Sequence, residues 1–140
     1  MKYLLDTNIW LEQLLAQNNA KDVEVLLNTV ASDQIAVSDF SFHSICVILS
    51  RLRATNILLQ FVQDVFIDAE VTLLSLTPPD TLIVIQAMNT YSLDFDDAYQ
   101  HTVATKYDLH IMSFDSHVDR TPRGRTTPHS ITQTGTAPGN

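Results

Sequence analysis

Short apolar runs alternate along this chain with longer segments in which apolar and polar positions follow a helical spacing. The short runs predict four buried strands, at residues 2–5, 35–37, 71–76 and 109–113. The longer segments predict helices over residues 8–17, 21–30, 41–53, 57–67, 80–90 and 94–107. Asn56 is expected to cap the fourth of these helices and Asp94 the last.

This order of strands and helices predicts an α/β fold with a parallel sheet. The chain has 140 residues and shows neither an internal repeat nor a linker, which fits one compact domain. We place that domain at residues 1–125. Residues 126–140 are rich in Thr, Pro and Gly, and we expect a C-terminal tail there that is partly disordered.

The composition narrows the class of protein. Hydrophobic residues make up 45% and charged residues 17%, the balance of a folded globular chain. No apolar run approaches the roughly 20 residues that span a bilayer, so no membrane association is expected. Asp6 comes too early for a signal peptide, and the single cysteine, Cys46, lies in an apolar run typical of a buried thiol. A cytoplasmic protein is therefore expected.

The net charge of -8 argues against binding nucleic acid by bulk electrostatics. The basic residues nevertheless form two local clusters: Arg51 and Arg53, and then Arg120, Arg123 and Arg125. Each cluster is either a solvated face or a contact for phosphates. An acidic protein can also bind RNA where metal ions bridge its carboxylates to the phosphates.

Acidic residues follow the predicted strands. Asp6, Asp39 and Asp115 come at or just after strand ends, and the Asp96–Asp97 pair lies in the first turn of a helix. In parallel sheets, the carboxyl ends of the strands meet at one edge, where ligands bind. Hard cations prefer carboxylate oxygen, and converging carboxylates repel one another without a cation. The pattern favours a divalent-metal site that activates water and stabilises the leaving oxygen of a phosphodiester.

Each acid also has a purely structural interpretation. Asp6, Asp39 and Asp94 each precede a predicted helix and could cap it. The Asp96–Asp97 pair could serve the helix dipole, and Asp115 could lie in a turn. The convergence of several acids at one sheet edge is thus more informative than any single position.

Three stretches of the chain resemble motifs of the PIN domain, a fold of toxin ribonucleases in bacterial and archaeal toxin–antitoxin pairs. They are Leu-Leu-Asp-Thr-Asn-Ile-Trp at residues 4–10, Leu-Asp-Phe-Asp-Asp-Ala at 93–98 and Ile-Met-Ser-Phe-Asp at 111–115. The resemblance covers roughly residues 1–120. It implies a three-layer sandwich, with a central parallel sheet of four to five strands flanked by helices. A fifth strand could lie between Phe114 and Arg125 or near residues 127–130.

The resemblance implies that Asp6, Asp97 and Asp115 are catalytic and bind Mg²⁺ or Mn²⁺. Asn8 or Thr7 would support the first of these ligands. Further supporting roles are implied for Asp96, Ser113 and Asp39.

The second motif departs from the family pattern. PIN domains place a glutamate early in the helix after the second strand, and here Ser44 stands at that position. Asp39 or His43 could substitute, or the site could hold metal with fewer ligands. His43 could also contact a phosphate or transfer a proton, although a lone histidine is more often structural.

We therefore expect a metal-dependent endoribonuclease, the toxin of a pair, with RNA as substrate held by the arginine clusters. Family members also form homodimers and bind a small antitoxin protein, for which the apolar helices at residues 11–30 and 57–67 are candidate surfaces. One alternative is a degenerate PIN-like module that binds RNA or a partner without cleavage. Another is a receiver-type phosphoacceptor domain, which the single Asp after the first strand and the missing Lys after the last strand disfavour.

Overall fold

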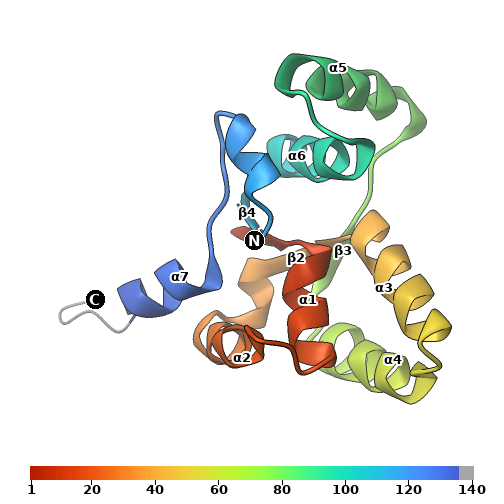
Figure 1. Ribbon diagram of the computed structural model, residues 1–140, viewed down its shortest axis with the longest axis vertical. Helices are drawn as coiled ribbons and strands as arrows, with labels where there is room; N and C mark the ends of the chain where they lie inside the picture. The colour runs from red at the N-terminus through yellow and green to blue at the C-terminus, as the bar shows by residue number, and fades with distance from the viewer. Residues whose placement is uncertain (136–140) are drawn as a thin grey trace.

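A parallel sheet lies at the centre of the protein, whose computed structural model describes the backbone of residues 1–135 and the side chains of residues 1–131 (Figure 1). The sheet has the order β3-β2-β1-β4, and every neighbouring pair of strands is parallel. Its strands are β1 (Tyr3–Leu5), β2 (Ile35–Ser38), β3 (Thr72–Leu74) and β4 (His110–Met112). The predicted α/β fold with a parallel sheet is confirmed.

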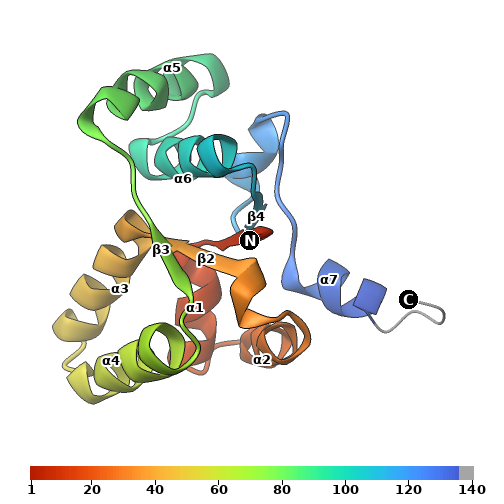
Figure 2. The same ribbon diagram turned by 180° about the vertical axis from the view of Figure 1, so that it is seen from behind.

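Helices cover both faces of the sheet. They are α1 (Thr7–Leu14), α2 (Ala20–Thr29), α3 (Asp39–Arg51), α4 (Thr55–Phe61), α5 (Thr81–Tyr91), α6 (Phe95–Tyr107) and α7 (Pro128–Gly135). Figures 1 and 2 show α5 and α6 on one side of the sheet, with α1, α2, α3 and α4 on the other. Short irregular helices complete the chain: η1 (Ser32–Gln34), η2 (Val62–Asp68), η3 (Pro78–Asp80) and η4 (Ser116–Arg120).

The alternation of side chains along β1 explains the two cores. Tyr3 and Leu5 point to one face and pack with buried residues of α1, α2 and α3, including Trp10. Leu4 points to the other face and packs with Val103 of α6 and its neighbours. Because both faces are covered, the strands can be apolar throughout, as the sequence pattern indicated.

The helix starts differ in part from the prediction. Ser38 caps α3, since its hydroxyl accepts a hydrogen bond from the Ser41 N–H at 3.0 Å, whereas Asp39 is the first residue of the helix. Asn56 does not cap α4, whose N-cap is Ala54. Asp94 is the N-cap of α6, but its side chain makes no capping hydrogen bond. Asp6 does cap α1 as expected, by accepting from the Thr7 N–H at 2.8 Å.

The segment after residue 125 begins with a bridge to the sheet and a helix. Thr126 forms an isolated parallel bridge with Met112, and α7 then packs against α2, with Ile131 against the core. Helix α7 occupies the place where a short strand near residues 127–130 was considered, so that expectation is wrong. Residues 136–140 of the predicted tail lie outside the described part of the chain. No helix among the described residues is long and apolar enough to cross a membrane.

The sheet brings distant acids to one edge. Leu5 pairs with Met112 in the register of β1 and β4, and the Asp6 N–H donates to the Met112 carbonyl at 2.9 Å. The residues that follow these two strands, Asp6 and Ser113, are therefore neighbours. Helix α6 begins at the same edge and runs back along the sheet, because β4 must start again from the opposite edge.

Candidate metal centre

Asp6 is buried at the end of β1 and held by three hydrogen bonds. Its Oδ1 accepts from the Thr7 N–H at 2.8 Å and from the Gln100 amide at 3.0 Å, and its Oδ2 accepts from the Ser113 hydroxyl at 2.8 Å. Burial raises the pKa of this carboxyl, and the three hydrogen bonds oppose that rise. Asp6 therefore has a fixed orientation on rigid elements, as a metal ligand requires.

Asp97 projects from the first turn of α6 and is only 7% exposed. Burial, followed by the charges of Asp115, Asp96 and Asp6, raises the pKa of Asp97 to about 6. Asp115 caps η4, and its Oδ1 accepts from the His117 N–H at 2.9 Å. These carboxylates converge closely enough to repel one another, which is the electrostatic condition that a cation would relieve.

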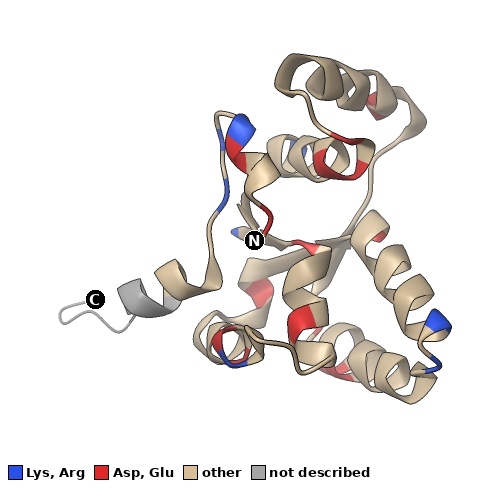
Figure 3. Ribbon diagram, viewed as in Figure 1, with Lys and Arg blue, Asp and Glu red and all other residues tan. Residues whose placement is uncertain are grey.

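The three aspartates share one cavity of about 300 Å³, called the aspartate cavity below. It is lined by Asp6, Thr7, Asn8, Leu11, Phe40, Ser44, Ile48, Asp96, Asp97, Gln100 and Asp115. Figure 3 shows acidic positions at the end of β1, at the start of α6 and after β4, all around the same edge of the sheet. The three acids that the sequence motifs singled out therefore line one cavity, but of these three, among the described residues, only Asp97 and Asp115, and not Asp6, belong to a group with the spacing of metal ligands.

The predicted supporting residues form a network behind the cavity. The Asn8 amide donates to the Ser113 hydroxyl at 3.1 Å, and Asn8 Oδ1 accepts from the Phe114 N–H at 3.1 Å. The Ser113 hydroxyl in turn accepts from the Asp115 N–H at 2.9 Å. Asn8 and Ser113 therefore connect the loops that carry Asp6 and Asp115. Asp96 lines the cavity beside Asp97.

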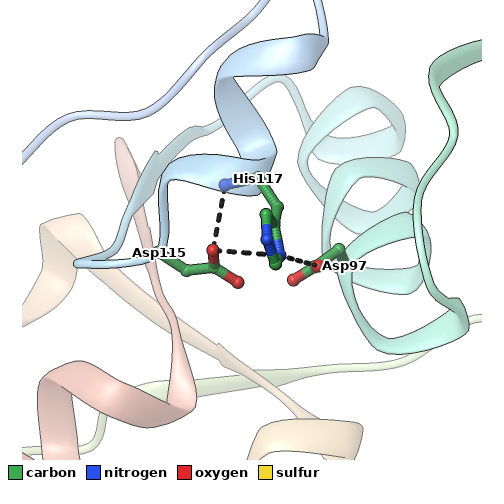
Figure 4. A group of neighbouring side chains, drawn as sticks. All are labelled: Asp97, Asp115 and His117. Atoms are coloured by element: carbon green, nitrogen blue, oxygen red, sulfur yellow. Dashed lines mark hydrogen bonds and ion pairs between the residues drawn. The ribbon is translucent and has the colours of Figure 1, made fainter.

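His117 joins the site, although the sequence analysis did not single it out (Figure 4). Its Nδ1 lies 3.5 Å from Asp97 Oδ2 and 3.3 Å from Asp115 Oδ1. One potential ligand atom from each of these residues lies within 4.8 Å of the other two. His117 comes two residues after Asp115, in a turn that Asp115 caps. This spacing was the signal in the sequence that pointed to His117.

A second set of acids at the start of α6, formed by Asp94, Asp96 and Asp97, has the same spacing. Asp94 and Asp96 are exposed, so water screens their charges, whereas Asp97 belongs to both sets and is buried. The more enclosed set, with Asp115 and His117, is the better candidate for holding an ion.

The donor set fits a divalent cation. The Asp97 side chain is largely buried, and the groups that face its carboxylate are the His117 ring and the Asp115 carboxyl. Two carboxylates held this close are costly unless they share a proton or a cation neutralises them. Carboxylate oxygens from Asp6, Asp97 and Asp115 are the ligand type that Mg²⁺ and Mn²⁺ prefer.

Ser44 takes the place of the expected glutamate and lines the aspartate cavity. Beside it, the buried Ser41 hydroxyl accepts from the Thr7 hydroxyl at 2.9 Å and from the Gln100 amide at 2.7 Å. Gln100 was also missed by the sequence analysis. Its spacing of three residues from Asp97 on α6, which puts both on one helix face, was the available signal.

Asp39 and His43 do not line the aspartate cavity. They line a separate surface hollow with Phe40 and Tyr99. There the Tyr99 hydroxyl donates to Asp39 Oδ1 at 2.7 Å, and this contact, after burial, raises the pKa of Tyr99 to about 12. The structure therefore gives Asp39 a partner away from the three aspartates and leaves His43 exposed outside their cavity.

The arginines occupy two regions, as Figure 3 shows for η4 with the loop after it and for the far end of α3. Arg120, on η4, donates to a backbone oxygen of the connection between α5 and α6 at 2.6 Å. Arg123 and Arg125 form ion pairs at 3.0 and 3.2 Å with nearby aspartates. Arg51 and Arg53 are exposed at the end of α3 that points away from the cavity. Because η4 starts next to Asp115, Arg120 is closer in sequence to the metal-site aspartates than Arg51 or Arg53.

A comparison with protein families matches the profile described as PIN domain to residues 3–124. No curated protein sequence matches the chain.

Solved structures share the fold. FitAcB from Neisseria gonorrhoeae has a TM-score of 0.76 at 20% sequence identity, and the match covers 91% of this chain and 98% of that chain. A toxin–antitoxin complex from Klebsiella pneumoniae has a TM-score of 0.69 at 16% identity, with the same coverage of 91% and 98%. VapBC2 from Rickettsia felis, bound to a DNA fragment from their promoter, has a TM-score of 0.72 at 15% identity, covering 91% and 98%.

Proposed function

This chain belongs to the PIN domain family, and from that premise we propose that it is a metal-dependent endoribonuclease and the toxin of a toxin–antitoxin pair. The observation that carries the proposal is the convergence of Asp6, Asp97 and Asp115 on one cavity at the carboxyl edge of a parallel sheet. Metal-dependent cleavage of a phosphodiester needs such a group of acids, because they hold the cation that binds the negatively charged phosphate.

The protein's own residues hold and orient the cation site. Asp97 supplies a carboxylate from α6 and Asp115 one from the start of η4. Hydrogen bonds from Gln100 and Ser113 fix the orientation of Asp6. A bound Mg²⁺ or Mn²⁺ would lower the pKa of a water molecule and stabilise charge on the phosphate. The fixed orientation of the carboxylates means that little reorganisation is needed when substrate binds.

RNA is the proposed substrate, in keeping with the resemblance to toxin ribonucleases. The overall charge of -8 repels a polyanion, so local arginines must help to position it. Arg120 is the candidate nearest in the chain to the metal ligands. Arg51 and Arg53, at the end of α3, would contact a longer RNA farther from the cavity.

An antitoxin is the proposed protein partner, because two of the neighbouring structures are a toxin–antitoxin complex and VapBC2. A mainly apolar groove of about 760 Å³ lies between α1, α2, α4 and η2, the helices that the sequence analysis named as candidate surfaces. Leu14, Leu27 and Ile57 line it, together with Trp10. The predicted homodimer stays a prediction, which sedimentation equilibrium tests.

Cleavage of a labelled single-stranded RNA with Mn²⁺ and with EDTA tests the nuclease. We expect wild-type protein to cut only with metal, and Asp97→Asn to lose at least about a hundredfold in rate, because one charged ligand is gone. Asp33→Asn, an exposed aspartate of η1, is the matched control and should cut like wild type. Equal rates for wild type and Asp97→Asn contradict the proposal.

A second function is favoured by one observation, the serine at position 44 in place of the glutamate. A PIN domain short of one acid could retain the fold and bind RNA or a partner without cutting. Calorimetric titration with Mn²⁺ separates the two functions. Binding below millimolar concentrations supports the nuclease, and no binding at millimolar metal supports the non-cleaving module.

A further inference from the structure

We propose that His117 is a nitrogen ligand of the metal centre and that it makes the site prefer divalent transition metals, such as Mn²⁺ and Co²⁺, over Mg²⁺. The inference rests on the proposed function in that it concerns the same cation. It goes further because it adds a ligand of a different chemical type, and that ligand determines which cation the protein takes.

The local fold places the His117 ring at the acids. Asp115 caps η4 and accepts from the His117 N–H at 2.9 Å, which fixes the backbone of His117 relative to that carboxylate. The ring then lies between Asp115 and Asp97, which comes from α6 (Figure 4). Two elements far apart in the sequence thus present two oxygens and one nitrogen to a common point.

The distances fit ligands of one ion better than they fit hydrogen bonds. The Nδ1 atom lies 3.3 Å from Asp115 Oδ1 and 3.5 Å from Asp97 Oδ2. Both exceed the usual 2.7–3.2 Å range of N–H···O hydrogen bonds. Donors bound at about 2.0–2.2 Å around one ion are separated by about 3.3–3.6 Å along the edge of a tetrahedron and by about 2.8–3.1 Å along the edge of an octahedron, so the observed distances match the tetrahedral spacing.

The environment of Asp97 gives a second, independent observation. Asp97 is 7% exposed, and its carboxylate faces the His117 ring at 3.5 Å and the like charge of Asp115. A surface ion pair with a half-exposed histidine offsets little of the cost of burying that charge. A cation held jointly by Asp97, Asp115 and His117 would neutralise it.

Because the family's glutamate is missing, a nitrogen ligand from His117 has a larger effect on which metal the site prefers. With Ser44 at that position, the cavity has one oxygen ligand fewer than the family pattern, and Mg²⁺ is the ion most dependent on oxygen ligands. Imidazole binds transition metals more readily than Mg²⁺, so replacing an oxygen by a nitrogen shifts the preference toward them.

Pulsed EPR of the full chain loaded with Mn²⁺ tests the assignment directly, because a coordinated imidazole gives a nitrogen hyperfine coupling. We expect this coupling in wild type and its loss in His117→Ala. His110→Asn, an exposed histidine of β4 outside the site, is the control and should retain it. In calorimetry, His117→Ala should weaken Co²⁺ binding by at least about tenfold and Mg²⁺ binding by less than about threefold.

The outcomes separate this inference from the nuclease proposal. Bound Mn²⁺ without nitrogen coupling in wild type, or with coupling that persists in His117→Ala, overturns the role of His117 and leaves the nuclease standing. Coupling without RNA cleavage supports His117 as a ligand and overturns the nuclease. No Mn²⁺ bound at millimolar concentration overturns both. Equal melting temperatures of the metal-free variants establish that the substitutions leave the fold intact.

Discussion

The Gln100 amide donates a hydrogen bond of 3.0 Å to Oδ1 of Asp6 across 94 residues of sequence. The same amide donates to the Ser41 hydroxyl at 2.7 Å, so one neutral side chain of α6 holds the end of β1 and the first turn of α3. Both Gln100 and Asp6 are buried. The aspartate cavity therefore depends on a residue that carries no charge and matches no motif.

Replacing Gln100 by leucine should destabilise the protein. The variant keeps the side-chain volume approximately but leaves the buried Asp6 carboxylate without one donor, and we expect a loss of about 1–3 kcal/mol in the free energy of unfolding. Urea unfolding at about pH 7 measures it. Gln63→Leu is the matched control, because it removes an exposed amide–carboxylate hydrogen bond of 2.8 Å and should cost less than about 0.5 kcal/mol. Equal losses in the two variants contradict the structural role of Gln100.

The raised pKa of Asp97 predicts how stability changes with pH in the metal-free protein. Asp97 has an ordinary pKa of 3.8 but one of about 6 in the folded state, so between these values the folded state binds more protons than the unfolded state. Rising pH through that window therefore lowers the free energy of unfolding. This loss of stability is fully present above about pH 6 and absent below about pH 4.

Urea unfolding in EDTA at several pH values checks this sign. Relative to Asp97→Asn, wild type should lose about 1–3 kcal/mol between about pH 4 and pH 7. Added Mn²⁺ should reverse the trend in wild type, because deprotonation then favours binding. If the stability of wild type and of Asp97→Asn changes in parallel with pH in EDTA, burial and repulsion do not raise the pKa of Asp97.

Restoring an acid at position 44 should strengthen the metal centre. Ser44→Glu adds a carboxylate to the aspartate cavity, so Mn²⁺ affinity should rise by at least about tenfold while the metal-free protein loses stability through repulsion. Calorimetry and thermal unfolding in EDTA measure the two effects. Ser50→Glu, exposed on the same helix, is the control and should change neither appreciably. Unchanged Mn²⁺ affinity in Ser44→Glu would place Ser44 outside the reach of the ion.

Arginine substitutions test where RNA lies. Binding is measured with the non-cleaving Asp97→Asn protein as background, at several salt concentrations. Arg120→Ala should lower RNA affinity and reduce the slope of log affinity against log salt by about 1, because a phosphate contact is lost. Arg51→Ala should have a smaller effect on a short RNA, since α3 carries it away from the cavity. The opposite ranking would assign the RNA path to α3.

The sequence predicted the strands, and acids at the carboxyl ends of two of them, because both follow from local pattern. An apolar run such as residues 2–5 can be covered only inside a sheet, and parallel strands must then present Asp6 and Asp115 at one edge. The family motifs supplied Asp97, whose burial local pattern could not predict. The PIN match over residues 3–124 and the four-stranded parallel sheet confirm the family and the fold, and the roles of the acids stay predictions.

Features that depend on distant contacts were missed. Helix α7 forms in a segment rich in Thr and Pro because Ile131 packs against the core beside α2, which local composition does not reveal. His117 reaches the acids through the turn of η4, and Gln100 reaches Asp6 only after α6 docks on the sheet. None of these side chains stands out in a sequence pattern, and each acquires its contacts only when distant elements pack together.

Anomalous diffraction from a crystal of the protein soaked in Mn²⁺ tests most directly whether the aspartates form one metal centre. The account predicts a strong peak in the aspartate cavity, within about 2.5 Å of carboxylate oxygens of Asp97 and Asp115 and of the His117 ring nitrogen. The peak should vanish in Asp97→Asn. A cavity without a peak at millimolar Mn²⁺, or a peak bound only to the exposed Asp94 and Asp96, would contradict it.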